Sequence, residues 1–173
     1  MTLVEIMIGA GIGSLTGAAI LALVFFSARS FAALSNYVDL DIYSRNALDK
    51  MCSEIRQANR LMVYSPTNLQ FEAVDPDSGA TNTLTYTYDA AAATLNRVYA
   101  GQTNTVLKEV LPNTLEFDMY QRNTLGGSVD NYPTTDVTAC KVVQLSWVCS
   151  RKILGQQANT ESVQSAKIMI RKQ

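Results

Sequence analysis

An uncharged apolar segment near the amino terminus constrains this chain more than any other feature. Residues 6–26, IMIGAGIGSLTGAAILALVFF, contain no charged side chain and no proline. At about 1.5 Å of helix per residue, about 20 apolar residues span the roughly 30 Å hydrocarbon core of a bilayer. A secretory signal peptide carries basic residues before its apolar run, whereas here the first basic residue, Arg29, follows it. We therefore predict a membrane-spanning helix over residues 1–28.

The rest of the chain has the composition of a single water-exposed domain. It is rich in Thr, Asn, Gln and Ser, and the 173 residues of the whole chain suffice for one such domain beside the helix. A net charge of −1 argues against nucleic-acid binding, which needs a basic surface. The chain contains no histidine, no glycine-rich phosphate loop and no nucleophile elbow. We predict a protein that is not an enzyme, with no catalytic residues, no metal site and no cofactor.

The apolar segment is preceded by one acid, Glu5, which is the only charged side chain among the first 28 residues. A carboxylate within hydrocarbon costs about 2.5–3.5 kcal/mol, so it requires a partner. One interpretation places Glu5 among lipid headgroups, where it would favour the positive end of the helix dipole. The other interpretation pairs it with the α-amino group of residue 1 in a neighbouring copy, at the same depth. Such a pair would set the axial offset between copies as each joins a fibre.

Three glycines, Gly9, Gly13 and Gly17, lie four residues apart and so share one face of the helix. Small residues at this spacing let apolar helices approach backbone to backbone. Glycine is also simply common in membrane helices, and this second interpretation is equally open. Each glycine costs the helix up to about 1 kcal/mol, so residues 9–18 are where the helix would unwind most easily.

The first six residues, MTLVEI, run directly into the apolar helix and resemble the mature amino terminus of type IV pilins and type II secretion pseudopilins. The resemblance implies that a prepilin peptidase removes a leader peptide and methylates the α-amino group of Met1. It also implies that Glu5 pairs with a neighbouring amino terminus, with Thr2 as a hydrogen-bonding companion. Two positions depart from the family pattern. The first residue is usually Phe, and many members carry proline where this chain has Ala22.

A second segment, residues 45–58, resembles the second half of the long helix in minor pilins and J-type pseudopilins. The resemblance therefore covers residues 1–60 and implies a pilin fold, in which this half packs on a C-terminal antiparallel sheet. The implied function is a structural subunit of a helical, homo-oligomeric filament. The subunit is expected first in the bacterial inner membrane and then, through the pilus assembly machinery, outside the cell on its surface. Two alternatives stay open: a minor pseudopilin of a type II secretion system, and a monomeric single-span protein whose anchored domain binds a partner.

The apolar pattern changes after the membrane segment. From residue 37 to residue 62 apolar residues recur at spacings of three and four, which predicts an amphipathic helix. No proline or glycine interrupts this stretch before Pro66. We predict one helix of about 60 residues, about 90 Å long. Its amphipathic half, residues 29–64, is expected to pack on a β-rich globular domain formed by residues 65–173.

Several segments after residue 65 are rich in β-branched and aromatic residues, with turn residues between them, which predicts strands. They are residues 69–74, 83–89, 94–100, 106–110, 115–121, 141–150 and 166–171. A single antiparallel sheet needs one buried face, and the amphipathic half of the helix supplies its cover, so the predicted fold class is α+β. Val143, Leu145 and Trp147 alternate along one strand and are expected against the helix. Residues 123–139 lack periodicity and are predicted to form a surface loop.

Three cysteines, Cys52, Cys140 and Cys149, lack the spacing of a zinc site. An exported domain permits disulfides, so one pair with one free thiol is one outcome. Cys140 and Cys149 bracket a predicted strand and would lie too far apart for a bond. Cys52 and Cys149 each share the apolar face of their element, which makes them the favoured pair. Three unpaired thiols are the alternative.

Overall fold

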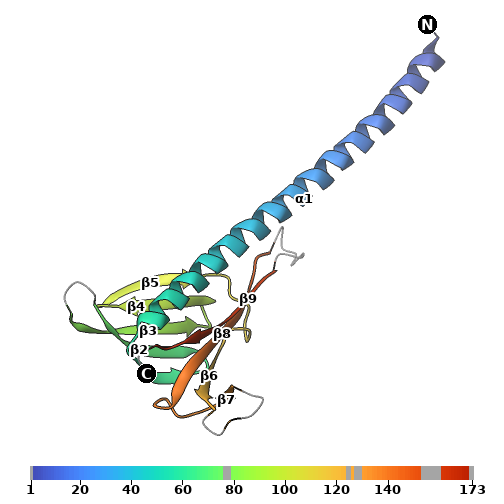
Figure 1. The fold of residues 1–173 in the computed structure, drawn as a ribbon. Helices are drawn as coiled ribbons and strands as arrows, with labels where there is room; N and C mark the ends of the chain where they lie inside the picture. Colours follow the sequence, from blue (N-terminus) through green and yellow to red (C-terminus); the bar gives the residue numbers. More distant parts are fainter. Residues whose placement is uncertain (1, 76–78, 124–125, 127–129, 153–160, 172–173) are drawn as a thin grey trace.

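The chain folds into one long helix followed by antiparallel β structure (Figure 1). The computed structural model describes residues 2–75, 79–123, 126, 130–152 and 161–171. Helix α1 runs over Leu3–Gln57, and the strands of both sheets come after it. The predicted α+β architecture, with an N-terminal helix and a C-terminal antiparallel β region, is confirmed.

Helix α1 ends earlier than the sequence pattern predicted. Gln57 is its last residue, and Ala58 already has extended backbone angles, φ −60° and ψ 146°. The prediction that the helix continues to residue 64 was wrong, because Arg60–Ser65 form strand β1. This segment turns at Pro66 and pairs antiparallel with the next strand, so hairpin pairing replaces the last helical turns. The globular domain therefore begins with β1.

The first sheet contains five antiparallel strands in chain order. Their bounds are β1 Arg60–Ser65, β2 Asn68–Val74, β3 Thr81–Asp89, β4 Thr94–Tyr99 and β5 Gln102–Leu107. Three predicted strands match β2, β3 and β4, whereas the strand predicted at 106–110 was misplaced. Ala100 and Gly101 have positive φ angles of 50° and 76°, as a two-residue type I′ hairpin requires. This tight turn starts β5 at Gln102.

The second sheet contains four antiparallel strands in the order β7-β6-β8-β9. Their bounds are β6 Glu116–Arg122, β7 Asn131–Pro133, β8 Cys140–Ser150 and β9 Glu161–Met169. The β region is therefore two sheets and not the single sheet predicted. Within the loop predicted over residues 123–139, residues 131–133 form β7 against β6, while residues 124–125 and 127–129 lie outside the described residues. The last strand begins at Glu161, before the predicted 166–171.

Both sheets and α1 enclose one apolar core (Figure 1). The Phe117 N–H donates to the Pro66 carbonyl over 3.1 Å, and the Tyr64 hydroxyl donates to the Phe117 carbonyl over 2.7 Å. These bonds join the first sheet to β6, while α1 packs against β9, β5 and β8. The buried side chains of α1 recur at spacings of three and four: Leu40, Ser44, Ala47, Met51 and Ile55. The side chains predicted to face the helix are buried in the same core, namely Val143, Leu145 and Trp147.

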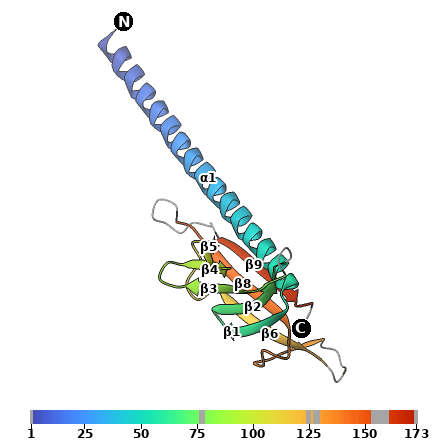
Figure 2. The ribbon, with the colours of Figure 1, turned by 90° about the vertical axis from the view of Figure 1, so that its left-hand side faces the viewer.

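Only the C-terminal part of α1 packs on the β domain. Leu40 is its first buried residue, and no residue from Thr2 to Asp39 is buried. Burial therefore begins at Leu40 and not at residue 29, with one earlier contact, in which Arg151 Nη1 donates to Asn36 Oδ1 over 3.3 Å. The preceding helix, about 55 Å long at 1.5 Å per residue, projects away from the domain (Figure 2).

Candidate assembly site

The amino-terminal end of α1 is closed by a capping box. The Thr2 N–H donates to Glu5 Oε2 over 2.8 Å, and the Glu5 N–H donates to Thr2 Oγ1 over 3.4 Å. This arrangement satisfies backbone donors that the first helical turn leaves unpaired, and such a cap contributes about 1 kcal/mol. Met1, the predicted site of methylation, lies outside the described residues. Sequence reasoning missed the reciprocal cap, although Thr2 and Glu5 have the T-x-x-E spacing that signals one.

The cap leaves the charge of Glu5 accessible to a further partner. A carboxylate has two oxygens with about four acceptor positions, and the Thr2 N–H occupies one of these at Oε2. Both side chains are exposed. Glu5 can therefore accept a hydrogen bond from an ammonium group of another molecule while it still caps its own helix.

Large apolar side chains surround the projecting part of α1. Consecutive apolar positions, such as Leu23–Phe26, place these side chains on every face of the helix. Leu3 and Phe25 are each 75% exposed, and Phe31 is 71% exposed. Burying one such side chain is worth about 1.5–3 kcal/mol, so water is a poor environment for this surface. Among the described residues, α1 is the helix long and apolar enough to cross a membrane, and it is compatible with membrane anchoring.

The glycine stripe, Gly9, Gly13 and Gly17, lies within the projecting part of α1. A β-carbon added at any of these positions would meet no atom within 4 Å beyond the adjacent helix backbone. The described chain therefore has no internal steric need for glycine here. The Ser14 and Thr16 hydroxyls donate to carbonyl oxygens one turn earlier, over 2.9 and 3.0 Å. The glycine face and the flanking hydroxyls, which are hydrogen-bonded within the helix, thus offer small residues to another helix or to lipid.

Polar contacts to both sheets fix α1 to the β domain. The Trp147 indole N–H donates to the Ser44 hydroxyl over 2.8 Å inside the core. Near the C-terminal end of the helix, Glu54 accepts a hydrogen bond from the Tyr86 hydroxyl and another from Arg97 Nε over 2.8 Å. Burial, together with the charge of Glu54, raises the pKa of Tyr86 well above its ordinary value, so the phenol keeps its proton and donates.

A second acid, Asp41, connects the helix to β9. Its Oδ1 atom accepts from the Ser162 hydroxyl and from Gln164 Nε2, each over 3.1 Å. Its other oxygen accepts from Arg45 Nε on the next helical turn over 2.8 Å. The two contacts with β9 join residues more than a hundred positions apart in sequence, so no local pattern could have identified them.

The three cysteines are free thiols in the structure, with Cys52 half-buried and Cys140 and Cys149 buried. The favoured disulfide between Cys52 and Cys149 is not formed. Cys149 pairs with Ser162 of β9, and the Ser162 hydroxyl hydrogen-bonds with Asp41, which precedes Cys52 by about 16 Å along the helix axis. Disulfide-bonded residues have Cα atoms within about 7 Å of each other, so this placement separates the two thiols. Cys140 and Cys149 lie at opposite ends of β8, as predicted.

In the part of the chain that the structure describes, no group of three or more Cys, Asp or Glu side chains is placed to hold a metal ion. No protein-family model, curated protein or solved structure matches the chain. What the chain does is therefore inferred from its own features: the charged cap, the exposed apolar helix, the glycine stripe and the attached β domain.

Proposed function

We propose that the chain is a structural subunit of a type IV pilus-like extracellular filament and has no enzymatic role. The observation that carries this proposal is the projecting part of α1, which is apolar and uncharged over residues 6–26 and buries none of its residues in its own domain. A prepilin peptidase would remove a leader and methylate Met1. The bacterial inner membrane would hold the subunit until the pilus assembly machinery extracts it.

The exposed apolar surface of α1 favours assembly because it must be shielded from water both inside and outside the membrane. Lipid shields this surface while the helix lies in a membrane. When the helix leaves the bilayer, equivalent helices of other copies can bury the same side chains, including Leu23–Phe26. The β domains, whose edge strand β5 exposes the polar run Gln102–Thr105, would then form the surface of the filament.

The negative charge of Glu5 also favours assembly into a filament. A carboxylate enclosed by apolar helices needs a positive partner. Arg29 is the first basic side chain of the chain and lies about 36 Å further along the helix, which puts it out of reach. The cation expected at the depth of Glu5 is the α-amino group of a neighbouring copy. That pair would fix how far each subunit is displaced along the filament.

The structure suggests two variants that separate capping from charge pairing. Glu5→Gln keeps an amide oxygen for the Thr2 N–H but removes the charge. Thr2→Ala removes the hydroxyl half of the cap but keeps the charge. Breaking a buried pair costs about 3 kcal/mol or more, so Glu5→Gln should lower the yield of sheared fibres at least about tenfold. Thr2→Ala should retain most of the yield.

Membrane fractionation should show both variants inserted to the level of the unaltered chain. Equal losses of fibres in the two variants would assign Glu5 to helix capping alone, and a normal yield from Glu5→Gln would remove charge pairing from the proposal. Scarce fibre-associated protein together with a defect in protein export would favour the minor pseudopilin. Membrane retention without assembly under any condition would favour the anchored monomer.

A further inference from the structure

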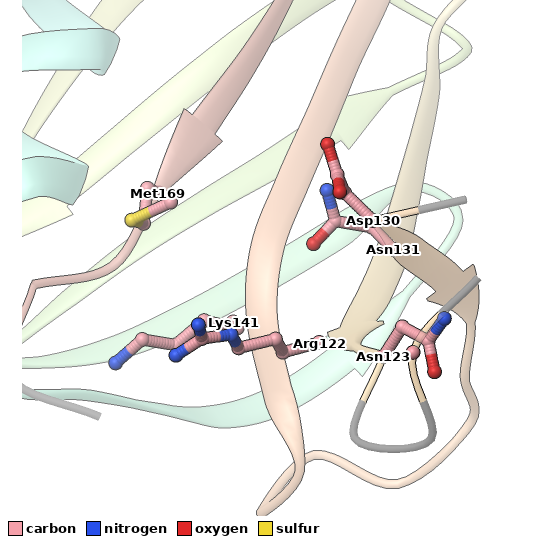
Figure 3. A pocket seen from close by; sticks show the side chains of 7 residues that line it. Arg122, Asn123, Asp130, Asn131, Lys141 and Met169 are labelled. Carbon is pink, nitrogen blue, oxygen red and sulfur yellow. The ribbon is translucent and has the colours of Figure 1, made fainter. Parts of the chain in front are cut away.

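A pocket of about 500 Å³ lies at the end of the β domain farthest from the amino terminus (Figure 3). Strand pairing forms it, because Arg122 on β6 pairs with Asn131 on β7, and the Asn123 N–H donates to the Asp130 carbonyl over 2.9 Å. On the other side, the Ile170 N–H donates to the Lys141 carbonyl over 3.0 Å and brings the end of β9 alongside. The described lining residues are Arg122, Asn123, Gly126, Asp130, Asn131, Lys141 and Met169.

Two cationic side chains, Arg122 and Lys141, lie on one side of this pocket. In Figure 3 both extend toward the side where Met169 lies. Within the described ranges neither makes an ion pair, whereas Arg60 and Arg97 each bond a carboxylate. Two unpaired cations that line one pocket repel each other, and an anion bound between them would relieve that repulsion. The planar guanidinium fits a carboxylate with two parallel hydrogen bonds, and the ammonium adds a point charge.

The opposite side of the pocket has a different chemistry. Asp130, Asn131 and Asn123 lie there in Figure 3, away from the cationic groups. A carboxylate there accepts hydrogen bonds and repels a second negative charge, which disfavours a densely charged polyanion. Each asparagine amide offers both donors and an acceptor, which complements hydroxyl groups that both donate and accept. The pocket therefore suits a ligand with one anionic end and a hydroxyl-bearing body.

We propose that this pocket binds an acidic sugar unit of the hexuronate type. Its carboxylate would lie between Arg122 and Lys141, and its ring hydroxyls would face Asp130 and the two amides. The volume falls in the range of about 300–1,000 Å³ typical of small-molecule sites and exceeds what a bare ion needs. The site goes beyond the filament proposal and does not depend on it, because the described lining residues belong to one copy of the chain.

Calorimetric titration of the full chain in detergent tests the proposal, with glucuronate as the probe and glucose, inorganic phosphate and glycine as comparisons. Glucuronate should bind, and glucose should bind at least about tenfold more weakly because it lacks the carboxylate. Arg122→Gln and Lys141→Gln should each weaken glucuronate binding about tenfold, as expected for the loss of a charge-assisted hydrogen bond. Lys108→Gln removes an exposed lysine outside the pocket and should have no effect.

Binding of phosphate as tight as that of glucuronate would reduce the site to a simple anion site and overturn the proposal. Tighter binding of glycine would replace it with an amino-acid site, and unchanged binding in the Arg122 and Lys141 variants would place the ligand elsewhere. Asn131→Ala gives a second readout, because it should weaken glucuronate binding and leave acetate binding unchanged. Near-ultraviolet circular dichroism from the buried Trp147 should be identical in all variants, which separates loss of the site from loss of the fold.

Discussion

Acidic side chains along α1 take different roles because their surroundings differ. Glu5 lies at the exposed end of the helix and caps it. Asp41 is half-buried and accepts hydrogen bonds from β9. Glu54 lies against the first sheet and accepts from Tyr86 and Arg97. The sequence identifies Glu5 as special because its neighbours are apolar, but it cannot identify the other two, since their partners come from distant strands.

Replacing Tyr86 by phenylalanine tests the contact with Glu54 at the residue scale. At neutral pH we expect a loss of about 1 kcal/mol in unfolding free energy, because a buried hydrogen bond disappears. The raised pKa of Tyr86 adds a pH effect. Above the unfolded-state pKa of about 10, the unfolded chain releases this proton while the folded chain keeps it, so stability falls as pH rises. Tyr86→Phe should remove that part of the alkaline loss.

Urea unfolding of the full chain in detergent measures both effects through the fluorescence of Trp147, the single tryptophan. Tyr132→Phe is the matched control, because Tyr132 is exposed on β7 and should change neither the stability at neutral pH nor its alkaline decline. The same alkaline decline in Tyr86→Phe as in the unaltered chain would contradict the coupling between burial and proton retention.

At the scale of elements, α1 was the most predictable part because its signals are local. The uncharged run and the later three- and four-residue spacing of apolar residues both predict a helix directly. The end of the helix at Gln57 was not predicted, because residues 58–64 contain no helix-breaking residue. That segment becomes β1 through pairing with β2, which a local pattern does not record. The start of β5 did have a local signal, since Ala100-Gly101 forms a tight turn. The short strand β7 depends on its pairing with β6.

The glycine stripe provides an element-scale prediction with a control on the same helix. Gly13→Leu places a large side chain on the stripe, where helices of other copies are expected to approach closely. Gly11→Leu makes the same change about 200° around the helix, on another face. A β-carbon at either position meets no atom within 4 Å beyond the adjacent helix backbone, and both positions are exposed, so both variants should fold and insert. Gly13→Leu should reduce fibre yield at least about tenfold, a loss of about 1.4 kcal/mol per contact or more.

Quantification of sheared fibres against membrane-held chain checks this prediction, with insertion of both variants confirmed by fractionation. A similar loss for Gly11→Leu and Gly13→Leu would show that bulk anywhere on the helix interferes. An unchanged yield for Gly13→Leu would mean that the glycines reflect a membrane helix in general and not a packing face.

At the scale of the whole molecule, one continuous helix, α1, has an exposed apolar part toward its amino-terminal end and carries the β domain at its carboxy-terminal end (Figures 1 and 2). The buried stripe from Leu40 to Ile55 holds the domain, and the helix before it buries no residue within the described chain. The exposed apolar part of α1 and the acid that precedes it, Glu5, were predictable from the sequence. The pocket containing Arg122 and Lys141 was not, because its cations come from different strands and meet only through sheet pairing.

The most direct test is a helical reconstruction of purified surface fibres made of this chain, at a resolution that places the Glu5 carboxylate. The account predicts helices of different copies packed along residues 3–39, with each Glu5 carboxylate within about 4 Å of the α-amino nitrogen of an adjacent subunit. A fibre in which Glu5 faces solvent with no amine from another copy beside it would contradict the account. So would a chain that persists in the membrane as a single copy surrounded by lipid.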